Sequence, residues 1–145
     1  MLTVRRACQE GGGYVDLRRM SMRCDPIHVE AAPRAVHYCH CSMCRRATGG
    51  PFAVIVWVAA QGVRWQCGTP RYRRSSRLAR RSFCEHCGTP ISLQYDDSPE
   101  LGLMVGAFDD PNLLEPTYHY GIEGRLKWCD AGGSLPRGQE TREVL

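Results

Sequence analysis

Apolar residues fall in short runs separated by turn residues, and no long helical stripe is present. The most apolar run, 52–60, is rich in Val, Ile, Phe and Trp and lies between Gly-Pro and Gln-Gly, which predicts a buried strand. Alternating apolar and polar residues predict strands over 63–66 and 91–95. Short strands with turn signals between them predict a mainly β domain. Further strands are expected over 101–108, 118–122 and 125–128.

The pattern of residue types along the chain changes near Val36. The residues before it carry a Gly-Gly-Gly run, many charges and little periodicity, so we expect an irregular N-terminal segment over 1–35. The 145 residues suit one ordinary domain, and no repeat or linker is visible. We therefore expect a single domain over 36–137 and a C-terminal tail over 138–145.

Composition argues against a membrane or secreted protein. The longest apolar run has nine residues, whereas a transmembrane helix needs about twenty. No apolar core of a signal peptide follows the first arginines, so we expect a cytoplasmic protein with reduced thiols. The nine cysteines are an odd number, so they cannot all pair as disulfides within one chain.

Cys84 and Cys87 form a CxxC pair that is followed by Gly88. Two thiolates at this spacing can chelate one ion from a tight turn, and the glycine supplies the left-handed backbone that such turns need. The alternative is a redox pair, which usually requires a helix N-terminus to lower the thiol pKa. Gly-Thr-Pro and a predicted strand follow instead, so the pattern favours half of a metal site.

Cys39, Cys41 and Cys44 place three thiolates in one short loop. Three protein ligands with an open fourth position are typical of a reactive zinc rather than a structural one. The spacing leaves two alternatives open. A distant fourth ligand could close the site, or the CxxC pair could complete one shared zinc site. The candidates for a distant ligand are Cys67, Cys129 and His119.

Three histidines lie close to the cysteines along the chain. Residues between chelating cysteines usually face outward, so we expect His40 and His86 to be exposed to solvent. His37 lies in a predicted strand, and we expect it to be a packing residue.

The segment 71–81 contains six arginines in eleven residues. Such a segment can bind phosphate or carboxylate groups. The net charge is only +4 and few aromatic residues are interleaved, which favours a solvated strand and turn, or a small anionic ligand, over nucleic acid. Lys127 is the only lysine against eighteen arginines, which indicates a GC-rich gene.

From Cys39 onward the chain resembles the glutathione-dependent formaldehyde-activating enzyme family, whose domain also occurs in centromere protein V. The matching pieces follow the family order over about three quarters of the chain. They are the segment 39–52, Ser75-Ser76, the segment 81–90, the segment 108–111, Pro116 with His119, and Trp128 with Leu135-Pro136.

The resemblance implies a mainly β fold of short antiparallel strands with two zinc sites. It implies that Cys39, Cys41 and Cys44 hold a zinc at the site that handles glutathione. It also implies that Cys84 and Cys87 hold a structural zinc together with an early Cys-x-Cys-Gly motif. The implied activity is carbon–sulfur lyase chemistry that joins glutathione and formaldehyde or reverses that step.

The chemistry of the residues agrees with this implied activity. A zinc with an open position can lower the pKa of a bound thiol, and the thiolate then attacks the carbon of an aldehyde. Arg45, Arg46 or members of 71–81 are candidates to hold the carboxylates of a small thiol such as glutathione. The competing hypothesis is a non-catalytic binding module that zinc stabilises; neither requires nucleic acid or a membrane.

The early Cys-x-Cys-Gly motif is missing from this chain. Only Cys8 and Cys24 are available where it should lie, and the sequence over 17–25 contains no such motif. If this segment is encoded by GC-rich codons, shifting the reading frame by one base there would give Cys-Gly-Gly-Cys-x-Cys-Gly-Ala. We therefore hypothesise a local frameshift, with the original reading frame restored before Pro33. The nucleotide sequence tests this hypothesis. For the chain as it stands, we expect a damaged structural site.

Overall fold

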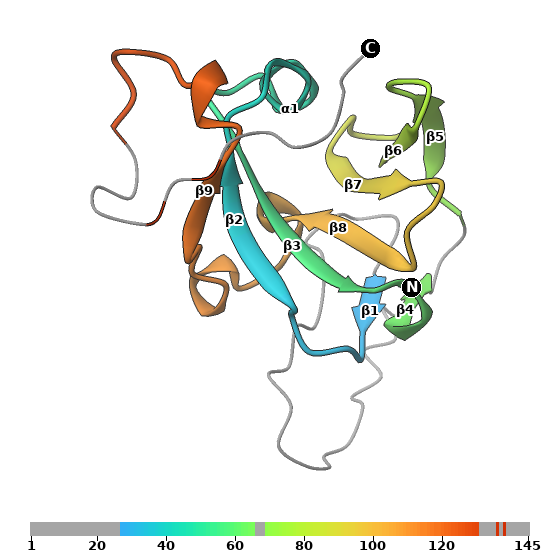
Figure 1. Ribbon diagram of the computed structural model, residues 1–145. Coiled ribbons are helices and arrows are strands. Elements are labelled where there is room, and N and C mark those ends of the chain that lie inside the picture. The colour runs from blue at the N-terminus through green and yellow to red at the C-terminus, as the bar shows by residue number, and fades with distance from the viewer. Residues whose placement is uncertain (1–26, 66–68, 131–135, 137, 139–145) are drawn as a thin grey trace, which may run out of the picture.

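A seven-stranded sheet dominates the computed structural model, which describes residues 27–65, 69–130, 136 and 138 (Figure 1). The strand order is β5-β6-β7-β8-β3-β2-β9, and every neighbouring pair is antiparallel except β2 with β9. The mainly β prediction is confirmed, with one parallel pair that the sequence did not indicate. The strands are β2 (Ala35–Cys39), β3 (Ala53–Ala59), β5 (Arg71–Arg74), β6 (Ala79–Phe83), β7 (Pro90–Tyr95), β8 (Glu100–Met104) and β9 (Tyr118–Tyr120).

Strand β3 is the predicted apolar run, and it lies inside the sheet between β8 and β2. Its β-branched residues suit the pleated surface of an inner strand. The 3₁₀ turn η1 (Ala60–Gly62) ends the strand and leads into β4 (Val63–Trp65). Strand β4 pairs with β1 (Ile27–Val29) in a separate two-stranded sheet. β3 and β4 therefore confirm the strands predicted over 52–60 and 63–66, of which Gln66 lies outside the described residues.

Three segments differ from the sequence-based expectation. The strand expected over 101–108 ends at Met104, and the 3₁₀ turn η2 (Val105–Ala107) follows it. The segment 125–128 forms turns instead of a strand, because its hydrogen bonds stay local: the amide of Cys129 donates to the carbonyl of Leu126. The region expected to be irregular before Val36 contains β1 and the first residue of β2.

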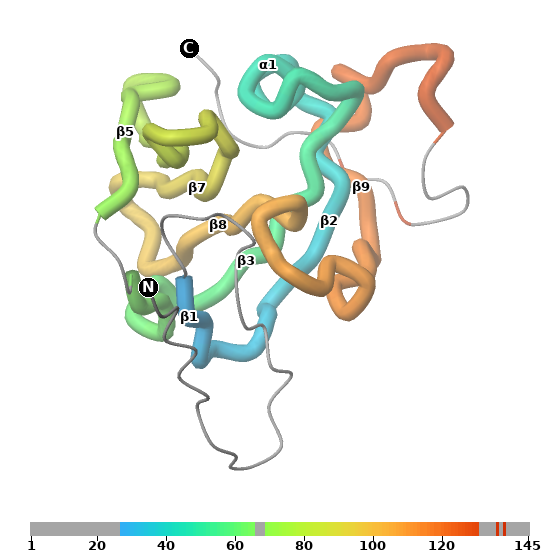
Figure 2. The backbone as a smooth tube through the Cα atoms, turned by 180° about the vertical axis from the view of Figure 1, so that it is seen from behind, coloured from blue at the N-terminus to red at the C-terminus, as the bar shows by residue number. Residues whose placement is uncertain are grey.

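A short helix, α1 (Ser42–Thr48), stands where the sequence indicated only a cysteine-rich turn. Its two turns are too few to show a helical stripe in the sequence. The Sγ atom of Cys41 caps it by accepting a hydrogen bond from the amide of Cys44 at 3.3 Å. Gly49 ends it with a φ of 70°, a left-handed conformation that suits glycine. Both views place α1 at the end of the sheet opposite to β1 (Figures 1 and 2).

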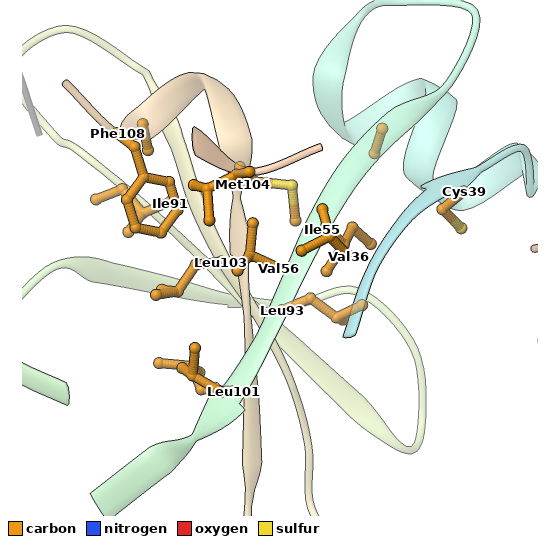
Figure 3. Close-up of a cluster of buried hydrophobic side chains, with 14 of the residues drawn as sticks. Val36, Cys39, Ile55, Val56, Ile91, Leu93, Leu101, Leu103, Met104 and Phe108 are labelled. Carbon is orange, nitrogen blue, oxygen red and sulfur yellow. The ribbon is translucent and has the colours of Figure 1, made fainter. Parts of the chain in front are cut away.

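The two faces of the sheet have different roles. On one face, Val36, Val56 and Leu103 lie opposite one another on adjacent strands, and Ile91 and Phe108 join them in the buried core (Figure 3). Side chains alternate along a strand, so the neighbouring positions of these strands point to the other face. That second face forms the floor of a cavity, which contains the candidate site.

None of the helices in the described residues is long and apolar enough to cross a bilayer.

Candidate functional site

Three cysteine sulfurs converge at the end of β2. Cys39 is the last residue of the strand, Cys41 caps α1, and Cys44 lies in the first turn of the helix. Their Sγ atoms all lie within 4.8 Å of one another, and the Cys39 and Cys41 sulfurs are 3.6 Å apart. All three residues are buried, with exposed fractions of 2–7%. The strand end and the short helix thus bring together the three cysteines that the sequence singled out.

Two glycines allow the chain after β9 to pack against this cysteine loop. A Cβ on Gly124 would lie 2.8 Å from the carbonyl oxygen of His40. Gly121 has a φ of +65°, and a Cβ there would lie 3.2 Å from the amide nitrogen of Cys41. The amide of His40 also donates to the carbonyl of Tyr120 at 2.9 Å. The chain after β9 therefore holds the backbone that carries the cysteines in place.

The cysteine cluster has an electrostatic partner on β6. The Nη2 atom of Arg81 donates to the Sγ atom of Cys44 at 3.2 Å. Hydrogen bonds from Cys39 and Cys41 lower the pKa of the Cys44 thiol to about 3, and Arg81 acts in the same direction. Conversely, the hydrogen bond between Cys39 and Cys41 raises the pKa of the Cys39 thiol. The arrangement favours one negative charge on Cys44, facing the guanidinium.

Arg81 is unusual among the arginines of its segment because it points inward. It is 5% exposed, and its Nε and Nη1 atoms have no hydrogen-bond partner among the described residues. The others on β5 are exposed, and two form ion pairs at the surface, Arg71 with Glu85 and Arg74 with Asp96, each at 2.6 Å. This agrees with the expected solvated strand and turn, except at Arg81.

The cysteines and Arg81 line one cavity of about 350 Å³. The strand register explains its floor. Arg81 lies opposite Leu93, Leu93 opposite Gly102, and Gly102 opposite Trp57, so these positions share one face of the sheet. Further lining side chains on this face are His37, Ile55, Tyr95, Tyr118 and Tyr120. This lining was not predicted from the sequence, although the period of two along each predicted strand indicates which side chains share a face.

The expectation that His40 is exposed is wrong. It is fully buried, and its Nε2 atom lies 2.8 Å from Nδ1 of His119 in a hydrogen bond. Cys39 and Cys41 face the cavity, so the residue between them points to the opposite side, but β9 and Phe52 cover that side. His86 is exposed, as predicted.

His37 is a packing residue, as expected. It is 4% exposed, and its ring stacks on that of Tyr118 with centroids 4.9 Å apart. Burial lowers its pKa to about 4, so the ring is neutral at neutral pH. It also lines the cavity, which its position in the sequence did not reveal.

The structure bears on the proposed fourth ligands of the triad. His119 pairs with Tyr38 in the register of β2 and β9, so it points to the face opposite Cys39. Within residues 27–65 and 69–130, no further His, Cys, Asp or Glu atom joins the cluster of three sulfurs, which leaves out Cys129 and the CxxC pair. Cys67 lies outside the described residues.

The second cysteine pair forms the tight turn that its sequence predicted. The amide of Gly88 donates to the carbonyl of Cys84 at 2.8 Å, and Gly88 has a φ of +74°. Cys84 is fully buried, whereas Cys87 is exposed and its Sγ lies 3.1 Å from Oγ1 of Thr89. The early segment 17–25, with Cys8 and Cys24 as the available partners, lies outside the described residues.

The triad has the chemistry and spacing of a zinc site. Zinc favours thiolate ligands at about 2.3 Å in a tetrahedral arrangement, which sets neighbouring sulfurs about 3.8 Å apart. The 3.6 Å between the Cys39 and Cys41 sulfurs agrees with that value. Cys39, Cys41 and Cys44 could therefore hold a zinc ion, because their donor atoms fit this metal.

Comparison with known proteins identifies the family. No curated protein matches this chain closely. A crystal structure of a Rhodobacter sphaeroides protein is similar, with 22% sequence identity, coverage of 79% of this chain and 93% of its own, and a TM-score of 0.47. The family described as glutathione-dependent formaldehyde-activating enzyme matches residues 19–123. Because this match spans well over half of the sequence, the chain belongs to that family.

Proposed function

We propose that the protein is a zinc-dependent carbon–sulfur lyase that acts on adducts of a thiol and an aldehyde, such as S-hydroxymethylglutathione. The observation that carries this proposal is the cluster of three buried cysteine sulfurs on the wall of a cavity, to which the described residues add no fourth ligand. Membership of the family supports the same chemistry.

Cys39, Cys41 and Cys44 would hold the zinc ion. When bound, zinc supplies the activation of a thiol, because it lowers the pKa of a sulfur that binds at an open position. The protein supplies the burial of the three ligands, which keeps water from competing with the substrate.

Cleavage of such an adduct breaks the bond between its sulfur and its hydroxyl-bearing carbon. The bonding electrons return to the sulfur, the hydroxyl proton leaves the oxygen, and a carbonyl group forms. The proton ends on the released thiol, so no oxidant or reductant is required. The reverse reaction joins the thiol and the aldehyde through the same steps.

Arg81 would stabilise charge during this step. One N–H group of its guanidinium is bonded to Cys44, and its Nε and Nη1 atoms keep their donors available within the described residues. We assign these donors to the oxygen of the adduct, which gains negative charge as its proton leaves. A buried donor that is already in place stabilises such charge without reorganisation.

Cys84 and Cys87 are proposed as half of a second, structural zinc site. The turn at Gly88 supports this role, because it presents both cysteines from one tight loop. The matching half is the early motif that the sequence lacks.

The alternative function is a non-catalytic binding module that zinc stabilises. It would require a fourth protein ligand on the triad, and Cys67 is the candidate outside the described residues. A closed site of four cysteines cannot bind a thiol, so the two functions differ in how the zinc responds to added thiols.

The deciding experiment titrates the zinc-loaded protein with glutathione and other small thiols and follows zinc-edge absorption. We expect the number of sulfur ligands on the zinc ion to increase as thiol is added. In parallel, NMR exchange spectroscopy measures how fast formaldehyde leaves the glutathione adduct, and we expect a rate increase that Cys44→Ser abolishes and Cys129→Ser preserves. Unchanged zinc coordination with every thiol would reject the lyase.

A further inference from the structure

A row of aromatic rings runs along the floor of the cavity. The rings of Tyr95 and Trp57 stack with centroids 6.1 Å apart at 16°, and those of Trp57 and His37 with centroids 6.4 Å apart at 14°. His37 in turn stacks on Tyr118 at 4.9 Å and 26°. All four residues line the cavity, and the other three are more exposed than the buried His37. The row therefore offers ring surface to a ligand.

The sheet register holds this row in place. His37 lies directly opposite Tyr118, whereas Trp57 is separated from β7 by the intervening strand β8. Gly102 of β8 lies opposite Trp57, and a Cβ there would lie 3.2 Å from the indole ring. The absent side chain lets the indole extend across β8 toward Tyr95. Because His37 and Cys39 are two positions apart on β2, the row also leads to the cysteine cluster.

The size of the cavity exceeds what a one-carbon group needs. Formaldehyde adds one carbon and one oxygen to a thiol, which is about the bulk of one or two water molecules at roughly 30 Å³ each. The cavity has a volume of about 350 Å³. Cavities of roughly this size and upward hold organic ligands with a substantial carbon skeleton. The cavity therefore has the size that an organic ligand fills, which a one-carbon group alone would not.

The charges of the lining also favour an apolar group. Arg81 is the buried cation of the cavity and already faces Cys44. Arg34 lies at the exposed rim, where it forms an ion pair with Glu100 at 2.9 Å. The carboxylates of a thiol such as glutathione thus fit the rim better than the ring row, which offers flat faces and edges to other rings.

We infer that the preferred adducts carry a flat, apolar group, as an aromatic aldehyde would provide, and that this group lies along the ring row. The inference rests on the proposed function, since it places the carbon–sulfur bond beside the cysteine cluster. It adds the substrate class: the aldehyde is aromatic rather than formaldehyde alone.

The test uses two stable thioethers that share one thiol. S-benzylglutathione carries a flat ring and S-methylglutathione does not, and calorimetry measures the binding of each to the zinc-loaded, full-length protein. Stacking on the row should make the benzyl compound bind about tenfold more tightly. Trp57→Leu should reduce this ratio to about threefold or less, while Trp57→Phe, which keeps a ring, should retain most of it.

The controls separate ring recognition from a general loss of structure. Trp128→Leu makes the same change at a residue that is 75% exposed and does not line the cavity, so the ratio should persist. Tyr118→Leu tests the row at its other end if Trp57→Leu fails to fold by circular dichroism. A ratio near one in the unaltered protein, or a ratio that neither cavity variant changes, overturns the inference.

The outcome is distinguishable from a failure of the proposed lyase. Preferred binding of the benzyl compound without cleavage of any adduct would reject the lyase and support the aromatic site. Cleavage of the formaldehyde adduct without a benzyl preference would support the lyase and overturn the aromatic site. Absence of binding by both thioethers also overturns the aromatic site.

Discussion

Arg81 and Cys44 meet in the buried wall of the cavity, where the Nη2 atom of the guanidinium donates to the Sγ atom of the cysteine at 3.2 Å. The two residues come from distant parts of the chain, from β6 and from the first turn of α1. A hydrogen bond to a charged group in a buried site is stronger than one at the surface. The contact therefore links the cysteine cluster at the end of β2 to β6, which lies near the opposite edge of the sheet.

Replacing Arg81 should reduce catalysis while the zinc ligands remain. We expect Arg81→Met to slow adduct cleavage about 100-fold or more, as the loss of one donor to a developing oxyanion does in other enzymes. Arg81→Lys should recover part of the rate, because it restores a positive charge without the planar fork. The measurement is the NMR exchange rate, together with zinc content.

The control for this prediction lies on the same strand. Arg80 is exposed and bonds to Gln94 at 2.8 Å, so Arg80→Met removes an arginine without reaching the cavity. Its rate should stay within about twofold of the original. Equal losses in both variants would show that Arg81 acts only through folding.

The close contact at Gly124 predicts an effect on the cysteine loop. In Gly124→Ala the new Cβ would meet the carbonyl oxygen of His40 at 2.8 Å, so the loop must shift. We expect a loss of about 1–3 kcal/mol in the free energy of unfolding and weaker zinc binding. Urea unfolding and competition with a zinc chelator measure the two effects.

Gly106→Ala is the matched control for Gly124→Ala. A Cβ at that position has no neighbour within 4 Å, and its backbone is not left-handed. Its stability and zinc affinity should remain close to those of the unaltered protein. If Gly124→Ala also leaves both unchanged, the turn after β9 does not position the cysteines.

Much of the fold could be predicted from the sequence, because β3 and β7 have strong local patterns. The apolar run and the alternation over 91–95 depend only on neighbouring residues. The parallel pairing of β2 with β9 could not be predicted, since it joins segments about eighty residues apart without a local signal. The short helix α1 was missed for the opposite reason: it is too short to show its period.

In the candidate site, too, the features with a local sequence pattern could be predicted and those that depend on distant residues could not. Cysteine spacing brought out the triad because all three ligands lie in one loop. Arg81 could not be told apart from the exposed arginines around it in the sequence, because its inward direction depends on its pairing with Leu93 across the sheet. The burial of His40 depends on β9, which covers the loop from a distant part of the sequence.

The histidine pair beneath the loop should matter for stability rather than for zinc. His119→Phe removes the 2.8 Å hydrogen bond between the two histidines, so buried His40 loses this partner. We expect a loss of about 1–3 kcal/mol in the free energy of unfolding. Zinc content should not change, because His119 points away from the three sulfurs. Loss of zinc in a folded His119→Phe protein would instead assign His119 to the metal.

Measuring the zinc content of the purified protein tests whether the triad and the CxxC pair differ in how tightly they hold zinc. The triad is complete within the described residues, whereas Cys84 and Cys87 supply half of a tetrahedral set. We expect one tightly held zinc per chain, lost in Cys44→Ser and retained in Cys87→Ser. A structural zinc contributes roughly 10–16 kcal/mol in small zinc peptides, so a working second site would resist chelators strongly. Two tightly held zinc ions would contradict the damaged site and would assign Cys8 and Cys24 as replacement ligands, which Cys24→Ser would then test by losing one of the two.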